Sequence, residues 1–151
     1  GNDARMIPRD PGSYVLIMAL TGPATIGVGR LGRFTFARGW YAYAGSARGP
    51  GGLAARVERH CRASKSRHWH VDYLRAYARP VSAWYTVGPE RWECSWAEAL
   101  SELPGASIPA PRFGASDCRC ATHLLHFPTP PSQSDFASLV EAPVSVENFN
   151  V

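Results

Sequence analysis

The sequence predicts an α/β fold, more strictly α+β, with a small, mainly antiparallel, three- to five-stranded sheet flanked by helices. Two observations predict it. Short runs of β-branched and aromatic residues alternate with Gly and Pro turns over the first 44 residues. Beyond them, Leu53, Val57 and Cys61 recur at the four-residue spacing of an amphipathic helix. The chain has 151 residues, of which 45% are hydrophobic, so one domain with a packed core is expected.

The first part of the chain is predicted to form strands. We expect strands at residues 13–20 and 24–28, which the Gly-Pro turn at 22–23 joins into a hairpin. A further strand at 33–36 precedes a run at 40–44 with aromatic residues at both parities. That run is typical of a central strand buried on both faces.

Helices dominate the middle of the chain. Helical patterns cover residues 53–63, 69–78 and 93–103, and a strand at 81–87 separates the last two. Residues 121–127 indicate one more short strand or helix. These elements predict a division into an extended lead-in, one globular domain and a Pro/Ser-rich tail that wraps the surface or is partly disordered. The divisions are 1–11, 12–127 and 128–151.

Charge divides the chain into two unlike halves. Residues 1–79 hold thirteen Lys or Arg and four Asp or Glu, a formal charge of +9, whereas residues 80–151 hold three and eight, a formal charge of −5. Fifteen of the sixteen basic residues are arginine, whose planar fork matches phosphate oxygens. Nucleic acid is therefore the first expected partner, although charge alone is equally explained by a general bias toward arginine. No membrane partner is expected, because the longest apolar run, at 14–20, is too short to span a bilayer.

The absence of a signal-peptide pattern favours a cytoplasmic protein. The sequence leaves the oligomeric state open. The chain is too large and too rich in tryptophan to resemble a small disulfide-stapled protein, so we expect its four cysteines to be thiols or metal ligands. Cys118, Cys120 and His123 fall in one short segment, and Cys94 would be a fourth ligand for tetrahedral zinc. Buried cysteines without metal are the alternative.

An ordered set of short motifs carries the functional hypothesis. The motifs are Gly12-x-Tyr14, Tyr43-x-Gly45 with the small residues Ser46 and Ala47 after it, Arg56-x-x-x-His60, and Glu93 at the start of a predicted helix. In this order, over residues 12–103, the chain resembles the GIY-YIG nuclease superfamily. The resemblance implies that residues 12–127 form a GIY-YIG-like nuclease domain that hydrolyses nucleic-acid phosphodiesters, with DNA as the expected substrate.

The resemblance also implies roles for five residues. Glu93 would bind one divalent ion, Mg²⁺ or Mn²⁺, and Arg56 would neutralise the charge that develops on the phosphorane. Tyr14 would deprotonate or orient the attacking water, which requires its pKa to fall from about 10 toward neutrality. Tyr43 and His60 would support that hydrogen-bond chain, and His60 would also move a proton. The residues expected to contact nucleic acid are Ser46, Arg48, Arg59, Arg62 and Lys65.

Two departures from the pattern concern spacing. Tyr14 and Tyr43 have 28 residues between them, more than in many members, which an inserted strand or hairpin would explain. Pro50-Gly51-Gly52 lengthens the path to Arg56. The overall resemblance is greatest to an uncharacterised prokaryotic branch with His-Trp-His-x-Asp-Tyr-Leu, Glu-Cys and Ser-Asp-Cys-x-Cys segments, here at 68–74, 93–94 and 116–120.

The segment His68-x-His70-x-Asp72 has two interpretations. An extended backbone would place all three side chains on one face as a metal triad. The following Tyr73-Leu74-x-x-Tyr77 favours a helix, which makes His70 and Asp72 capping or supporting groups and leaves Trp69 in the core.

Two other functions stay open beside the nuclease. One is a non-cleaving nucleic-acid-binding module stabilised by zinc at Cys94, Cys118, Cys120 and His123. The other is a metalloenzyme acting on a small molecule, with His68 and His70 joining Cys118 and Cys120 around a transition metal.

Overall fold

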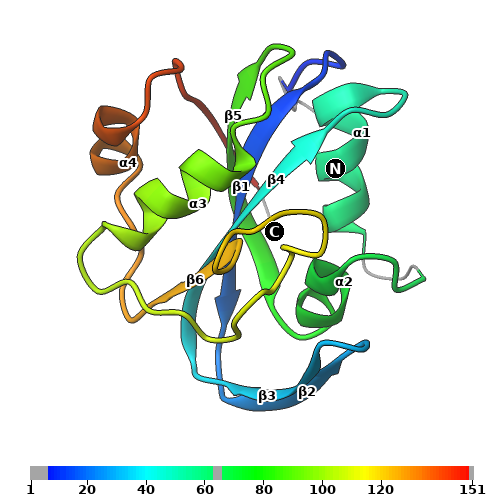
Figure 1. The fold of residues 1–151 in the computed structure, drawn as a ribbon, viewed down its shortest axis with the longest axis vertical. Helices are drawn as coiled ribbons and strands as arrows, with labels where there is room; N and C mark the ends of the chain where they lie inside the picture. Colours follow the sequence, from blue (N-terminus) through cyan, green and yellow to red (C-terminus); the bar gives the residue numbers. More distant parts are fainter. Residues whose placement is uncertain (1–6, 63–65, 150–151) are drawn as a thin grey trace.

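The computed structural model describes residues 7–62 and 66–149. Its main sheet consists of β1 (Gly12–Leu20), β4 (Gly39–Ala47), β5 (Arg79–Val87), β6 (Leu124–Phe127) and β7 (Ser145–Asn148). All neighbours are antiparallel, in the order β6-β4-β1-β5-β7. The helices are α1 (Gly52–Cys61), α2 (His70–Arg75), α3 (Glu93–Ser101) and α4 (Gln133–Leu139). Since α1 and α2 lie on one face of the sheet and α3 and α4 on the other (Figure 1), the predicted fold class is confirmed.

The central strand β1 is buried along its whole length because both of its faces pack against helices. Successive side chains of a strand point to opposite faces. Tyr14, Leu16 and Met18 accordingly join the core beneath α1 and α2, while Val15 and Ile17 join the core beneath α3 and α4. This explains why the strand reads as a continuous apolar run.

The predicted hairpin of residues 13–20 with 24–28 is wrong. The second segment, β2 (Ala24–Val28), pairs instead with β3 (Gly32–Phe36) in a separate two-stranded sheet at one end of the molecule (Figure 1). The chain leaves the main sheet after Leu20 and returns directly opposite it at Gly39. Two long strands that are both buried pair better with each other than with a short, half-exposed one. The β2–β3 hairpin lies in the long stretch of chain between Tyr14 and Tyr43.

The segment before β1 is part of the core and not only a lead-in. Ile7 is buried beneath α1, and the carbonyls of Pro8 and Asp10 accept hydrogen bonds from the amides of Ala54 and Leu53 at 2.9 Å each. The first amides of a helix have no partner within it. Residues 7–10 therefore cap α1 in place of a side chain, which Gly51 at the N-cap position does not have.

The described part of the Pro/Ser-rich segment, residues 128–149, wraps the surface and forms one helix and one strand. It contains α4, whose Phe136 is buried against Trp84 and Trp96 at ring distances of 5.3 and 5.1 Å. It then adds β7 to the outer side of β5. This segment pairs with the edge of β5, which would otherwise have unpaired backbone groups, and buries apolar surface of α3.

The remaining predicted boundaries shift by a few residues. The helix predicted at 69–78 is the shorter α2, the one predicted at 93–103 ends at Ser101, and the segment at 121–127 contains the strand β6. Residue 63, the predicted end of the first helix, lies outside the described residues. Within the described parts of the chain, no helix has the length and apolar character needed to cross a bilayer.

Candidate functional site

Two tyrosines meet on the face of the sheet that α1 covers. Tyr14 on β1 lies opposite Gly45 on β4, and the rings of Tyr14 and Tyr43 are 6.4 Å apart. A Cβ atom at position 45 would lie 2.6 Å from the Tyr14 hydroxyl oxygen. Glycine at this position therefore leaves the space that the Tyr14 ring occupies.

Helix α1 adds a histidine and an arginine from one of its faces. The hydroxyl of Tyr14 and Nε2 of His60 are 2.7 Å apart, and His60 is fully buried. One turn earlier, Nη1 of Arg56 donates to the carbonyl of Ser46 at 2.7 Å. The Arg56 guanidinium lies 4.3 Å from the ring centre of Trp69, so its plane is held by an aromatic face as well as by a hydrogen bond.

The carboxylate of Glu93 arrives from the other half of the chain. Glu93 is the first residue of α3 and is half-buried. The hydroxyl of Ser46 donates to its Oε1 at 2.5 Å. Because the carbonyl of Ser46 also accepts from Arg56, one residue of β4 links the arginine to the carboxylate. The structure thus brings together all five side chains singled out as catalytic: Tyr14, Tyr43, Arg56, His60 and Glu93.

The pKa values of both tyrosine hydroxyls are raised in this environment. Burial raises the pKa of Tyr14 to about 12, although the nearby Arg56 acts to lower it. Burial also raises the pKa of Tyr43. Both hydroxyls are therefore protonated at neutral pH, because desolvation penalises the phenolate. A general base at this position would need a lowered Tyr14 pKa, whereas burial in the protein raises it.

Of the residues expected to contact nucleic acid, Arg48 and Arg59, like Ser46, have partners within the protein. Arg48 donates to the carbonyls of Gly88 and Glu90 at 3.0 and 2.5 Å, which ties the segment before α3 to β4. Arg59 forms an ion pair with Asp72 at 2.8 Å. Lys65 lies outside the described residues.

A depression in the surface borders the cluster on the α1 side. Its volume is about 170 Å³, and it is lined by the glycine-rich turn before α1 and by Arg56, Arg59 and Arg62. Arg62 is exposed there. Arg56 and Arg59 of α1, and Arg62 at its C-cap, thus border a common hollow.

The His68-x-His70-x-Asp72 segment does not form a metal triad. Asp72 Oδ2 accepts hydrogen bonds from the amides of His68 and Trp69 at 2.7 and 2.8 Å, and thereby caps α2. Burial on its own would raise the Asp72 pKa, but these amides and Arg59 lower it overall. His70 Nδ1 accepts from the amide of Gly114 at 2.8 Å. The capping interpretation of the sequence is therefore confirmed for Asp72.

Sequence reasoning missed the contact of Trp69 with two arginines. It is half-buried, and the guanidinium groups of Arg56 and Arg59 lie 4.3 and 4.6 Å from its ring centre. The available signal was the spacing of the two arginines, three residues apart on one helix, which places both on one side. Nothing in the sequence indicated that a tryptophan ten residues further on would lie beneath both.

A second cluster of polar side chains lies where α3 meets the segment before β6. Sulfur and imidazole atoms of Cys94, Cys118, Cys120 and His123 all lie within 4.8 Å of one another. Burial lowers the pKa of His123, which keeps its imidazole neutral at neutral pH. A Cys₃His group of this kind could bind a metal ion such as zinc. Among the described residues it is the one candidate metal group, and it includes neither His68 nor His70.

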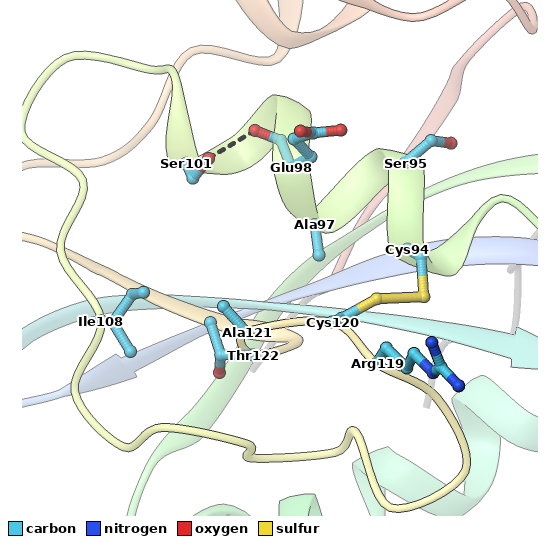
Figure 2. A pocket seen from close by; sticks show the side chains of 10 residues that line it. All are labelled: Cys94, Ser95, Ala97, Glu98, Ser101, Ile108, Arg119, Cys120, Ala121 and Thr122. Carbon is cyan, nitrogen blue, oxygen red and sulfur yellow. Dashed lines mark hydrogen bonds between the residues drawn. A yellow bond between two sulfur atoms is a disulfide. The ribbon is translucent and has the colours of Figure 1, made fainter.

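The expectation that all cysteines are thiols or metal ligands is wrong for two of them as the structure stands. Cys94 and Cys120 form a disulfide, while Cys61 and Cys118 are thiols. The cysteines are 26 residues apart, but the first turn of α3 packs directly on the loop that carries Cys120. Figure 2 shows this disulfide at the border of a pocket of about 530 Å³.

Together, the fold and these two clusters define a class: an α/β protein whose antiparallel five-stranded sheet carries a Tyr/Arg/His/Glu cluster on one face and a Cys₃His group beside α3. The chain belongs to the family described as a domain of unknown function, DUF123, which matches residues 13–144. The matched range includes both clusters and α4. No curated protein matches the chain, and no solved structure does.

Proposed function

We propose that the protein is a metal-dependent endonuclease that hydrolyses phosphodiester bonds of nucleic acid, with DNA as the expected substrate. The observation that carries this proposal is the convergence of five side chains from four separate elements on one site. Phosphodiester hydrolysis needs a path for the proton of the attacking water, a fixed positive charge beside the phosphate and a cation at the leaving oxygen. The residues of this site match those needs.

Arg56 is suited to hold the scissile phosphate. Its guanidinium is fixed on two sides, by the Ser46 carbonyl and by the ring of Trp69, so little entropy is lost when it binds a phosphate. It also borders the hollow lined by Arg59 and Arg62. A phosphate backbone crossing this hollow would meet the charges of Arg56 and Arg62, and binding would weaken as salt is added.

Tyr14 and His60 form the proton path in this proposal. With His60 protonated at Nδ1, the hydroxyl of Tyr14 donates to Nε2 across 2.7 Å. Because the Tyr14 pKa is about 12, the hydroxyl is protonated in the resting protein. Tyr14 would therefore orient the attacking water and pass a proton to His60 as it takes one from the water. Tyr43, whose ring lies 6.2 Å from that of His60, would support this pair by packing against it.

Glu93 is the residue that would hold the divalent ion. Mg²⁺ retains several waters and needs only one or two protein carboxylates, and Mn²⁺ accepts the same ligands. A single half-buried carboxylate, oriented by the Ser46 hydroxyl at 2.5 Å, fits that requirement. When bound, the ion would supply positive charge at the phosphate and the leaving oxygen.

The test uses metal-free protein incubated with labelled single-stranded, double-stranded and branched DNA and with matching RNA, before and after addition of Mg²⁺ or Mn²⁺. Cleavage should require the ion and should fall by about 100-fold or more in Arg56→Ala and in Glu93→Gln. Glu102→Gln is the matched control, because Glu102 follows the same helix and is exposed; it should cleave normally.

Equal cleavage by all four proteins would contradict the assignment of the site. Salt-sensitive binding without cleavage in any of them would contradict the nuclease and favour the non-cleaving nucleic-acid-binding module. The range of substrates that are cut would identify the class of nucleic acid.

A further inference from the structure

We propose that Cys94, Cys118, Cys120 and His123 form a tetrahedral zinc site that joins the first turn of α3 to the loop before β6. This site goes beyond the proposed nuclease, because its ligands are separate from the Glu93 carboxylate and its role is to hold the structure together. The distances, the surrounding hydrogen bonds and the access route support it.

Two of the distances between donor atoms match those that zinc requires. Nε2 of His123 lies 3.4 Å from the sulfur of Cys118 and 3.5 Å from that of Cys94. With Zn–S bonds of about 2.3 Å and Zn–N bonds of about 2.0 Å, tetrahedral geometry separates a sulfur from a nitrogen by about 3.6 Å. All four donor atoms lie within 4.8 Å of one another. Once the sulfurs of Cys94 and Cys120 separate, the four atoms are close enough to bind one ion.

The disulfide accounts for only half of this arrangement. A bond between Cys94 and Cys120 gives no reason for Cys118 and His123 to converge on the same point. In the zinc form the two sulfurs are thiolates about 3.8 Å apart. Two equivalents of a small thiol convert one form to the other: two electrons enter the S–S bond, the small thiols leave as their own disulfide, and Zn²⁺ then displaces the protons of Cys94, Cys118 and Cys120.

The loop that carries three of the ligands is fixed by its own hydrogen bonds. The guanidinium of Arg112 donates to the carbonyls of Cys120, Cys118 and Ala115 at 2.5, 2.6 and 2.6 Å. The backbone of His123 is held on both sides, since its amide donates to Phe113 at 2.7 Å and its carbonyl accepts from Ala44 of β4 at 2.9 Å. The ligands are thus in position before an ion arrives, which reduces the entropic cost of binding.

An entry path leads to the ligands. The pocket of about 530 Å³ is bordered by Cys94 and Cys120, and the two sulfurs lie between α3 and the loop (Figure 2). Metal sites need such a route for the ion. Since Cys94 directly follows Glu93, zinc would also fix the end of α3 that carries this carboxylate; that consequence, unlike the site itself, rests on the proposed nuclease.

The experiment measures zinc in the full chain purified with a small-thiol reductant and dialysed against buffer containing trace zinc. Elemental analysis should find one zinc per chain, and replacement by Co²⁺ should produce the thiolate-to-cobalt absorption and the intense visible bands of a tetrahedral site. Cys118→Ser should lose the metal and these bands. Cys61→Ser, a control that changes a thiol of α1, should keep both.

Cys118→Ser separates zinc from the disulfide, because Cys118 is outside the Cys94–Cys120 bond. Circular dichroism establishes that the variant is folded, and His123→Asn provides a second ligand variant with the same expected loss. Metal-free wild-type protein with two alkylatable thiols after denaturation would overturn the zinc site and establish the disulfide. Metal retained equally in Cys118→Ser and His123→Asn would also overturn it. None of these readouts depends on cleavage, so failure of the nuclease proposal leaves the result intact.

Discussion

The absence of a side chain at Gly45 is what allows Tyr14 to lie across β4. In Gly45→Ala, the new Cβ would lie 2.6 Å from the hydroxyl oxygen and 2.7 Å from Cζ of Tyr14. Tyr14 is fully buried and cannot move aside freely, so the variant should lose about 1–3 kcal/mol of unfolding free energy. Urea titration measures this loss. Cleavage, if present, should fall with it because the Tyr14–His60 contact is displaced.

The matched control is Gly27→Ala in β2, where a Cβ would have no neighbour within 4 Å. Its unfolding free energy should change by no more than about 0.5 kcal/mol. Equal stability of the two alanine variants would show that Tyr14 does not occupy the space above Gly45.

Asp72 should make the stability of the protein sensitive to acid. Its buried carboxylate accepts from two backbone amides and from Arg59, and its pKa is lowered overall. A lowered pKa in the native state means that the stabilisation is complete above the ordinary Asp pKa of about 4 and is lost as the pH falls through the native value. Asp72→Asn should therefore cost about 2 kcal/mol at neutral pH and much less in acid.

Unfolding by urea over a range of pH measures this difference. Glu58→Gln, a change at an exposed position of α1, should follow the wild-type curve. A constant gap between Asp72→Asn and the wild type from neutral to acidic pH would contradict the assignment to the charged carboxylate.

At the scale of elements, α4 shows how an irregular composition can conceal an ordered segment. Phe136 is fully buried between Trp84 of β5 and Trp96 of α3. Phe136→Ala should therefore cost about 3–5 kcal/mol of unfolding free energy, which calorimetry or urea titration measures. Leu139→Ala, at an exposed position of the same helix, should cost far less. Similar losses for both would mean that α4 does not dock through Phe136.

Element by element, prediction succeeded where a segment carries its own signal. The positions of β1, β4, α1 and α3 follow from apolar patterns inside each segment. It failed for the pairing of β2 and did not find α4 or β7, because pairing of a strand and docking of a short helix depend on surfaces far away in the sequence. The prolines and serines near α4 and β7 give no local signal for a helix or a strand. Both elements are stabilised by distant contacts, β7 by pairing with β5 and α4 by packing on Trp84.

At the scale of the whole molecule, the candidate site draws on both halves of the chain. Four of its five residues belong to the basic first half, and only Glu93 comes from the acidic second half. Antiparallel pairing of β1 with both β4 and β5 brings the halves into one sheet. The Glu93 carboxylate is thus placed near the arginines of the first half, which is the arrangement that a cation and a phosphate would need in order to bind together.

The sequence by itself determined which residues are candidates and on which elements they lie, because the repeats of two and 3.6 residues that mark strands and helices are properties of one segment. It also indicated the four members of the Cys₃His group. Only the tertiary structure decided that Ser46 joins Arg56 to Glu93, that Trp69 lies beneath two arginines, and that Cys94 reaches the loop of Cys120. These contacts join residues far apart in the chain, and their geometry depends on how whole elements pack, which no local pattern records.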